Sequence, residues 1–490
     1  MKAHSSAHHR LTTEPEKLLK QNSPSGQLPA VVYIIALTQF VLPFMYSGVT
    51  VTLPALGLEF AASGVTLALI ETVYLGAGAA FLLPLGCIAE KTDKRTLFRI
   101  GLLVYAIATV TIGALPSTES ILAVRFIQGI ASAFMGATVM AILFEATPSG
   151  ARGKAIGLSM GAVYLGLAAG PLVAGIITTQ FGWRWVYFLT AVPLFGTFIS
   201  MEVVLSARWK LSRLTVNWLS SLLVTAAVFL LISGSALLGD GRLGYILIVV
   251  GLATAVSFFA IDKRSRQPLL RLSSIWSNSR YARALASQLL VYSAAFGMTF
   301  IFSLYLQIVK GFTSQDAGIM LIISPILMAA IAPLSGRLAD RYPPARLAAL
   351  GTLLITISLL MASQISAGTA LTYLVAVLAI QGVGLGLFSA PNLSLILHSV
   401  QKHELNQASA LSAKTRSLGM VASMTVVVLF LSLHLGGSPI AQPGGDYHEI
   451  LFGYLSVVES SFVVHAALAC LAAALFVVRA RRVTRTEDPS

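Results

Sequence analysis

The chain has 490 residues, of which 56% are hydrophobic and only 11% are charged. Soluble domains carry about 25% charged residues, so this composition, with a mean hydropathy of +0.82, excludes an ordinary soluble enzyme and predicts many membrane spans. The formal net charge of +14 would indicate nucleic-acid binding only if the basic residues clustered on a soluble face. Cys87 and Cys470 lie in separate apolar runs, which argues against a disulfide framework and a cysteine metal site.

Residues 1–28 are polar and lack the layout of a signal peptide, so they predict a cytoplasmic tail. Beyond them, fourteen apolar runs are each long enough to cross a bilayer as a helix. The runs lie near residues 30–55, 64–88, 97–115, 120–144, 154–178, 183–205, 216–238, 243–261, 284–308, 315–336, 346–366, 370–398, 408–434 and 459–479. An even number of spans places both termini on one side of the membrane.

The basic residues predict which side that is. With both termini in the cytoplasm, 29 of the 33 basic residues fall in cytoplasmic loops, in the tails or at adjoining span ends. We count Lys414 and Arg416 among these cytoplasmic charges. Lysine and arginine are enriched in cytoplasmic loops of membrane proteins, so the bias predicts a multi-pass protein of the inner (cytoplasmic) membrane and explains the net charge without nucleic acid.

Charged residues deep within spans are candidates for function, because each costs about 2.5–3.5 kcal/mol at the centre of a bilayer helix. Glu71 lies about two turns into the second run, and Arg125 lies about as deep in the fourth. A carboxylate whose proton affinity rises on burial and falls when Arg125 approaches could couple transport to protons. The alternatives are a permanent structural ion pair and a Glu71 hydrated near the membrane surface.

The fifth run is rich in glycine and contains a proline. At about 100° per residue, Gly161 and Gly175 fall on one face of a helix, whereas Gly166 and Gly170 fall on the opposite face, just before Pro171. Small residues let membrane helices approach closely. We therefore expect this span to pack on two sides, inside its own bundle and against the other half of the protein.

Aromatic and polar side chains in later spans are candidates for a binding cavity. Tyr292 and Phe296 lie in the ninth run, and Asn392 lies in the twelfth. Aromatic stripes in spans more often serve packing, which is the alternative for these residues. We find no Walker loop, no His-Glu-x-x-His and no cysteine pair, so we expect no cofactor, no metal and no ATP-driven transport by this chain.

An internal repeat divides the chain. Gly86-Cys-Ile-Ala-Glu90-Lys91 is echoed 250 residues later by Gly336-Arg-Leu-Ala-Asp340-Arg341, and Gln128-Gly129 is echoed 253 residues later by Gln381-Gly382. Repeated halves with the binding site between them are typical of secondary transporters. We predict five units along the chain: a cytoplasmic tail (1–28), a six-helix bundle (29–206), an insert of two helices with a basic linker (207–270), a second six-helix bundle (271–480) and a second cytoplasmic tail (481–490).

Several short motifs occur together in these spans and loops. The loop residues are Gly86, Glu90, Lys91, Lys94 and Arg95, with Gly336, Asp340, Arg341 and Arg346 in the second copy. The span motifs are Arg125-Phe-Ile-Gln128-Gly129 and Gly166-x-x-x-Gly170-Pro171-x-x-Ala174-Gly175, followed by Trp183-Arg184-Trp185 and Asn217-Trp218. With these motifs the sequence resembles the major facilitator superfamily, and within it the fourteen-span drug:proton antiporter branch.

The resemblance implies an all-α integral membrane protein of two six-helix bundles plus two inserted transmembrane helices. It implies alternating access and proton-coupled efflux of small apolar or amphipathic compounds, by a protein that we expect to be monomeric. The loop pairs Glu90–Arg95 and Asp340–Arg346 are expected to make charge-assisted contacts with helix ends and to latch one conformation. One feature departs from the branch: no acidic residue occurs between Glu16 and Glu59, so the first span lacks a carboxylate.

Two other classes of function stay open at this point. The chain could export or import one specific metabolite, or it could be a non-transporting membrane sensor or a membrane-embedded enzyme. The scarcity of acidic residues within the spans and the lack of a soluble domain argue against a sensor and an enzyme.

Overall fold

The computed structural model describes residues 28–484, apart from 149–150, 205–216, 240, 266–267, 271–277, 402–403 and 440–446. The expected N-terminal tail up to residue 27, most of the basic linker and residues 485–490 lie outside the described residues. The helices are α2 (Ala30–Glu59), α3 (Gly64–Lys91), α4 (Lys94–Ala114), α5 (Thr118–Ala146), α6 (Arg152–Phe181), α7 (Trp183–Val204), α8 (Trp218–Ala236), α9 (Arg242–Arg264), α11 (Ser279–Ala295), α12 (Met298–Leu304), the π-helical turn η2 (Tyr305–Val309), α13 (Ser314–Leu321), α14 (Ile323–Ala339), α15 (Pro344–Ala362), α16 (Leu371–His398), α17 (Leu405–Leu435) and α18 (Tyr447–Thr484).

Within this described part, fourteen helical spans are long and apolar enough to cross a membrane. The predicted all-helical, fourteen-span architecture is therefore confirmed. Polar residues begin several of the helices, because the first backbone N–H groups of a helix lack partners within it. The Asp93 carboxylate accepts from the backbone of Thr96 at the start of α4, and the Ser63 hydroxyl accepts from the backbone of Thr66 at the start of α3.

Two spans that the sequence predicted as single runs are interrupted. The ninth span consists of α11, α12 and η2, and the tenth consists of α13 and α14. Between α11 and α12, the Gly297 N–H donates to the Ser423 hydroxyl of α17 (2.8 Å), and that hydroxyl lies 3.1 Å from Nε2 of His465 in α18. Apolar runs do not reveal such breaks, because hydropathy is the same on either side of them.

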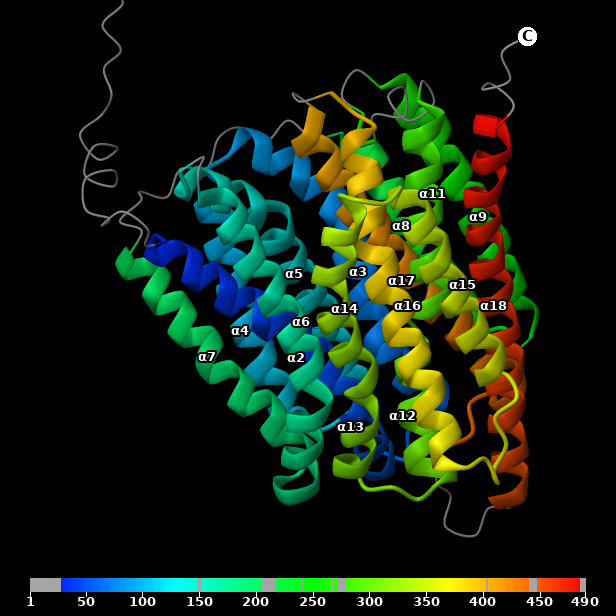
Figure 1. Cartoon of the computed structure of the whole chain (residues 1–490). Coiled ribbons are helices and arrows are strands. Elements are labelled where there is room, and N and C mark those ends of the chain that lie inside the picture. The colour runs from blue at the N-terminus through cyan, green and yellow to red at the C-terminus, as the bar shows by residue number, and fades with distance from the viewer. Residues whose placement is uncertain are drawn as a thin grey trace, which may run out of the picture.

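The helices form two groups, and the pair α8 and α9 lies beside them (Figure 1). The helices α2 to α7 pack against one another, most closely as the pairs α2–α6, α3–α5 and α4–α5. The helices α11 to α18 form the second group, in which α15–α16 and α14–α16 are the closest pairs. The helices α8 and α9 pack together, and α8 contacts both α3 and α17. The exact boundaries predicted between these units fall in segments outside the described residues and stay predictions.

The internal repeat is visible in the packing. A Cβ added at Gly129 of α5 would lie 2.3 Å from the carbonyl oxygen of Tyr74 in α3. A Cβ added at Gly382 of α16 would lie 2.4 Å from the carbonyl oxygen of Ser324 in α14. These residues are related by the same offsets of 253 and 250 as the sequence motifs. Both halves therefore use an equivalent glycine for an equivalent close crossing of two helices.

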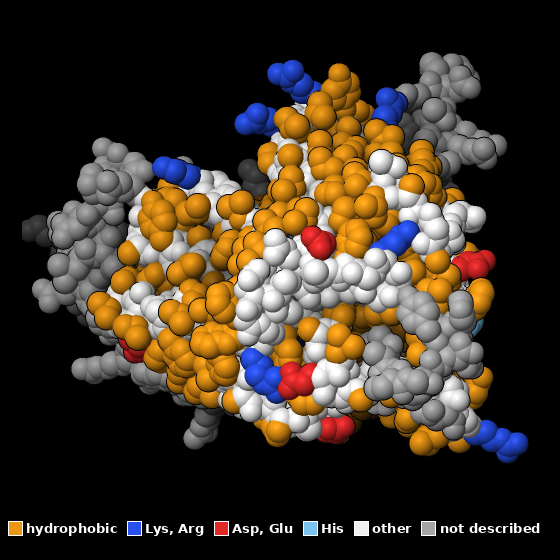
Figure 2. All heavy atoms as spheres, turned by 90° about the horizontal axis from the view of Figure 1, so that it is seen from below, with side chains coloured by type: hydrophobic (Ala, Val, Ile, Leu, Met, Phe, Trp, Pro, Cys, Tyr) orange, Lys and Arg blue, Asp and Glu red, His pale blue; other side chains and the backbone are white. Residues whose placement is uncertain are grey.

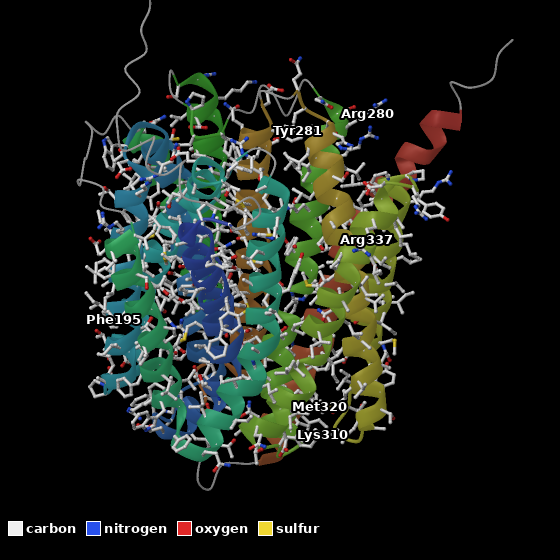
Figure 3. The ribbon with its side chains drawn as sticks, turned by 60° about the vertical axis from the view of Figure 1, so that its left-hand side comes forward. Phe195, Arg280, Tyr281, Lys310, Met320 and Arg337 are labelled. Atoms are coloured by element: carbon white, nitrogen blue, oxygen red, sulfur yellow. The ribbon has the colours of Figure 1, made fainter. Side chains whose placement is uncertain are left out.

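The two halves contact each other along α3 and α17 and, at one end of the molecule, also through α2 and α6 with α12 and α13. We call the end at which α2 begins and α18 ends the terminal face, and the other end the opposite face; Lys310 and Met320 lie toward the opposite face, whereas Arg280, Tyr281 and Arg337 lie toward the terminal face (Figure 3). Seen from the opposite face, the described surface is mainly hydrophobic and carries few charged side chains (Figure 2).

Direct contacts close the opposite face. The Ser303 hydroxyl of α12 donates to the carbonyl of Thr50 (2.8 Å), and the Gln307 amide of η2 donates to the carbonyl of Val51 (3.1 Å). The backbone N–H of Gln315 donates to the Thr179 hydroxyl at the end of α6 (3.1 Å). These bonds join α2 and α6 of the first half to the second half at this end.

Candidate functional site

Glu71 of α3 is buried beside α2. Its side chain is 2% exposed. The Thr50 hydroxyl donates to Oε1 of Glu71 (2.5 Å), and the Tyr46 hydroxyl donates to Oε2 (3.4 Å). Both partners come from α2, whose face toward α3 presents them one turn apart. A Glu71 hydrated at the membrane surface, one of the alternatives considered from the sequence, does not fit this burial.

Arg125 of α5 is equally buried, at 2% exposed. Its Nη1 donates to Oε1 of Gln128 (2.8 Å), and its Nη2 donates to the Tyr187 hydroxyl (3.1 Å). Gln128 is held in turn by its amide, which donates to the Thr109 hydroxyl (2.8 Å). The guanidinium carbon also lies 5.5 Å from the ring centroid of Tyr74, within range of a cation–π interaction. The hydrogen-bond partners of Arg125 are thus neutral groups of its own half.

Glu71 and Arg125 do not form an ion pair in this structure. The three ion pairs recorded between described residues are Lys94–Glu145, Arg99–Glu202 and Arg184–Glu59. Two aromatic rings lie between the two buried charges and contact each other: Tyr46 stacks on Tyr74 with 6.4 Å between the ring centroids. The permanent ion pair considered from the sequence is absent from this conformation, so each charge has neutral partners and can respond to the other.

Thr50 links the buried carboxylate to the closed opposite face. Its hydroxyl donates to Glu71, and its backbone carbonyl accepts from Ser303 of the other half. Ser303 also accepts from the amide of Gln307, which bonds to the next carbonyl of α2. One residue therefore connects a group able to bind a proton with the contacts that join the two halves.

The aromatic candidates of the ninth span lie at the boundary between the halves. Phe296 stacks on Tyr46 of α2, with 4.9 Å between ring centroids and 23° between ring planes. Tyr292 is 8% exposed, and its hydroxyl interacts electrostatically with Arg416 of α17 and Tyr164 of α6. These residues meet across the interface, as a cavity between repeated halves requires.

Asn392 is not part of this group. It is 1% exposed and lies between α16 and α11. Its Oδ1 accepts from the Ser287 hydroxyl (3.2 Å), and its amide donates to the carbonyl of Ala284 (3.2 Å). These partners satisfy Asn392 within the second half, so the packing alternative describes it better than the cavity prediction.

Sequence reasoning missed Arg416. We counted it among cytoplasmic charges, but it lies 11 residues after Leu405, the first residue of α17. This depth is about 16 Å at a rise of about 1.5 Å per residue. The signal was present, because Arg416 falls inside the apolar run at 408–434. Because we counted Arg416 as a loop charge, we did not consider it among the charges within spans.

The fifth-span glycines divide into packed and unpacked positions. A Cβ at Gly166 would lie 2.2 Å from the carbonyl oxygen of Phe40, and a Cβ at Gly170 would lie 2.1 Å from the Ser47 hydroxyl, so both pack against α2. Gly175 packs against the second half, where a Cβ would lie 2.4 Å from the carbonyl oxygen of Ser314.

Pro171 belongs to the same contact, because a Cβ at Gly318 of α13 would lie 2.2 Å from its carbonyl oxygen. Gly161 does not pack as expected: a Cβ there would meet no atom of the described chain within 4 Å. The physical reason is that α6 touches the second half near the opposite face and is separated from it toward the terminal face.

The first copy of the loop is only partly described. The side chains of Glu90 and Lys91 lie outside the described residues, so the Glu90–Arg95 contact stays a prediction. The backbone N–H of Arg95 donates to Asp93 (3.3 Å), and a Cβ at Gly86 would lie 3.3 Å from Nζ of Lys414.

The second copy of the loop forms no latch. In the described part of the chain, no ion pair or side-chain hydrogen bond is recorded for Asp340, Arg341 or Arg346, all of which are exposed. The predicted Asp340–Arg346 latch is therefore not formed, and Gly336 has only Ala390 near its Cβ position, at 3.9 Å. Ion pairs of the first half, Lys94–Glu145 and Arg99–Glu202, join helix ends at the terminal face instead.

No group of three or more His, Cys, Asp or Glu able to hold a metal occurs among the residues that the structure describes.

Comparisons with known proteins agree with this architecture. The family model of the Major Facilitator Superfamily matches residues 35–424 and 290–490. The chain is 24% identical to the riboflavin transporter RibZ of Clostridioides difficile over 79% of this chain and 85% of that protein. It is 24% identical to the multidrug resistance protein Stp of Mycobacterium tuberculosis (80% and 73%) and 25% identical to the tetracenomycin C resistance and export protein of Streptomyces glaucescens (79% and 73%).

Solved structures show the same fold. A bacterial homologue of the human lysosomal transporter Spinster, in an inward-facing and unoccupied conformation, aligns with a TM-score of 0.64 at 17% identity, covering 94% of this chain and 99% of that one. The POT family transporter PepTSo aligns with a TM-score of 0.65 at 13% identity, with the same coverage.

Proposed function

Because the chain belongs to the Major Facilitator Superfamily, a family of membrane transporters and not of enzymes, we propose that it exports small apolar or amphipathic compounds in exchange for protons. Transport of a small molecule by a multi-pass membrane protein is what the family and the fourteen spans establish. The direction, the coupling ion and the breadth of substrates are the proposal. Relatives named for multidrug resistance and for antibiotic export support it.

The observation that carries proton coupling is the double role of Thr50. A deprotonated Glu71 accepts the hydroxyl of Thr50 while the carbonyl of Thr50 accepts from Ser303 across the interface. A protonated Glu71 is a weaker acceptor. Proton binding therefore loosens α2 at the point where it holds the opposite face closed.

We place both termini and the terminal face in the cytoplasm, in a bacterial inner membrane. The positive charge of the predicted cytoplasmic loops supports this orientation. The closed opposite face then lies outside, and the gap beside Gly161 opens toward the cytoplasm. Substrate would enter from inside, and Glu71 would take up a proton from outside once the closed face has opened, so that proton and substrate cross in opposite directions. The structure in this orientation is the substrate-loading state of an exporter.

The narrower function, transport of one specific metabolite, is favoured by one observation. The chain is as similar to a protein named as a riboflavin transporter as to one named for multidrug resistance, at 24% identity in each case. Transport of riboflavin without transport of unrelated aromatic compounds would support this second function.

The test uses purified protein in liposomes and three fixed-charge or neutral probes: naphthalene-2-sulfonate, 2-naphthyltrimethylammonium and 2-naphthamide. We expect an imposed pH gradient to drive at least one probe faster than in protein-free liposomes. Glu71→Gln should reduce this gradient-driven flux about tenfold or more, in line with typical coupling free energies. Glu459→Gln, which changes an exposed carboxylate of α18, is the matched control. Equal gradient-driven flux in wild type and Glu71→Gln would refute coupling through Glu71.

A further inference from the structure

Arg416 is a cation deep in a span whose neighbours supply no carboxylate. It is half-buried, 11 residues into α17. None of the three ion pairs between described residues includes it. A cation at membrane depth is costly without a partner and indicates a ligand or an ion pathway.

Tyr292 of α11 connects Arg416 with the first half. The Cβ of Tyr292 lies 2.8 Å from the Cβ position of Gly419, one turn after Arg416, and its hydroxyl interacts with the Arg416 guanidinium and with Tyr164 of α6. The helices α11 and α17 are tightly packed next to this point, since a Cβ at Gly419 would lie 2.8 Å from the carbonyl oxygen of Leu289. Arg416 therefore lies beside Tyr292 on a tightly packed part of the second half, and Tyr292 lies near Tyr164 of the first.

The face of α6 that carries Tyr164 has open space beside it. Tyr164 lies three residues after Gly161, so the two share a face of α6. A Cβ at Gly161, or at Gly157 one turn nearer the terminal face, would meet no atom of the described chain within 4 Å. The same face closes against α13 further along, at Gly175. Arg416 and the two tyrosines thus lie between an open gap and the closed opposite face.

The charge of this region is positive. The helices α6, α11 and α17 contain no aspartate or glutamate in their described sequences. The buried carboxylate of the first half, Glu71, already accepts hydrogen bonds from the hydroxyls of Thr50 and Tyr46. An aromatic surface lies one turn from Tyr292, where Phe296 stacks on Tyr46.

We propose that Arg416, with the hydroxyls of Tyr164 and Tyr292, binds the anionic group of the transported compound, so that this transporter acts on amphipathic organic anions. The guanidinium supplies charge-assisted hydrogen bonds to a carboxylate or sulfonate, and the aromatic pair receives the apolar body. This inference rests on the proposed function, because it names the class of compound that the cavity admits. It also accounts for a first span without the carboxylate that would attract cations.

The test is equilibrium dialysis of the purified full-length protein against naphthalene-2-sulfonate and 2-naphthyltrimethylammonium, without a pH gradient. We expect wild type to bind the sulfonate at least about tenfold more tightly than the ammonium, the range typical of hydrogen bonds to charged groups. Arg416→Gln should remove this preference, and Arg416→Lys should retain part of it. Arg337→Gln, which removes an exposed arginine of α14, is the matched control and should bind like wild type.

Equal binding of the two probes by wild type, or a preference that survives in Arg416→Gln, would overturn the proposal. So would an equal loss in Arg337→Gln, because that result would indicate a general surface-charge effect. If Arg416→Gln does not give a monodisperse protein, Tyr164→Phe decides: weaker binding of the sulfonate with unchanged binding of the ammonium supports the site, and no change in either overturns it. Because no gradient is applied, the outcome is independent of whether Glu71 couples transport to protons.

Discussion

The two halves of the molecule share their packing but not their charges. Glu71 and Arg125 of the first half correspond, at the repeat offsets of 250 and 253, to Leu321 and Leu378 of the second. All four side chains are buried, at 2%, 2%, 1% and 2% exposed, respectively. The glycine crossings at Gly129 and Gly382 are equivalent in both halves. Duplication therefore kept the scaffold, whereas only the first half holds a carboxylate and a guanidinium at these positions.

A substitution that makes the first half resemble the second should reduce transport more than the other substitutions below. Arg125→Leu copies the residue at position 378 and leaves Gln128 and the Tyr187 hydroxyl without their partner. We expect gradient-driven flux to fall about tenfold or more, and stability to fall by about 1–3 kcal/mol per unsatisfied group. Flux in liposomes and thermal unfolding in detergent measure the two effects. Arg346→Leu, at an exposed position, is the control; similar flux loss there would remove the distinction between the halves.

Substitutions at the glycine crossings that the two halves share should lower stability equally in both halves. Gly129→Ala and Gly382→Ala each place a Cβ within 2.4 Å of a backbone carbonyl oxygen, and overpacking of this kind costs about 1–3 kcal/mol. We expect similar decreases in Tm for the two variants. Gly161→Ala should leave Tm unchanged, because its Cβ meets open space. Destabilisation by only one of the two crossing variants would contradict the structural equivalence of the halves.

The link through Thr50 should have an intermediate effect. Thr50→Val removes the hydroxyl that Glu71 accepts and keeps the shape of the side chain. Loss of one hydrogen bond to a charged group should reduce gradient-driven flux by about tenfold at most. Thr52→Val is the control in the same helix, since its hydroxyl bonds only to the carbonyl of Val49. Unchanged flux in Thr50→Val would separate Glu71 from the contacts at the opposite face.

Substitutions in the ion pairs at the terminal face should have the smallest effect, which is on stability. Lys94 pairs with Glu145, and both side chains are partly exposed, so Lys94→Gln should lower stability by less than about 1 kcal/mol. The corresponding position of the second half is Pro344, which forms no such pair. Asp340→Asn, in the unlatched loop, should leave Tm within experimental error. A larger loss in Asp340→Asn than in Lys94→Gln would indicate a latch that forms in another conformation.

The sequence was sufficient for the spans, the repeat and the buried charges, because hydropathy, spacing and charge are local properties. It could not reveal that Thr50 and Tyr46 are the partners of Glu71, since these contacts depend on how α2 and α3 are rotated against each other. Gly161 was misjudged because its surroundings depend on the conformation of the whole transporter. Arg416 was misjudged because a residue 11 positions inside α17 was assigned to the loop that precedes this helix.

The break in the ninth span has a mechanical consequence. At Gly297 the backbone N–H is satisfied by Ser423 of another helix, which lies against His465 of the last span. A helix whose hydrogen bond is supplied from outside can bend there without losing it. The segment that carries Tyr292 can therefore swing relative to the segment that carries Ser303. His465, which lies outside the repeated helices, therefore helps to position the hydroxyl that satisfies this break.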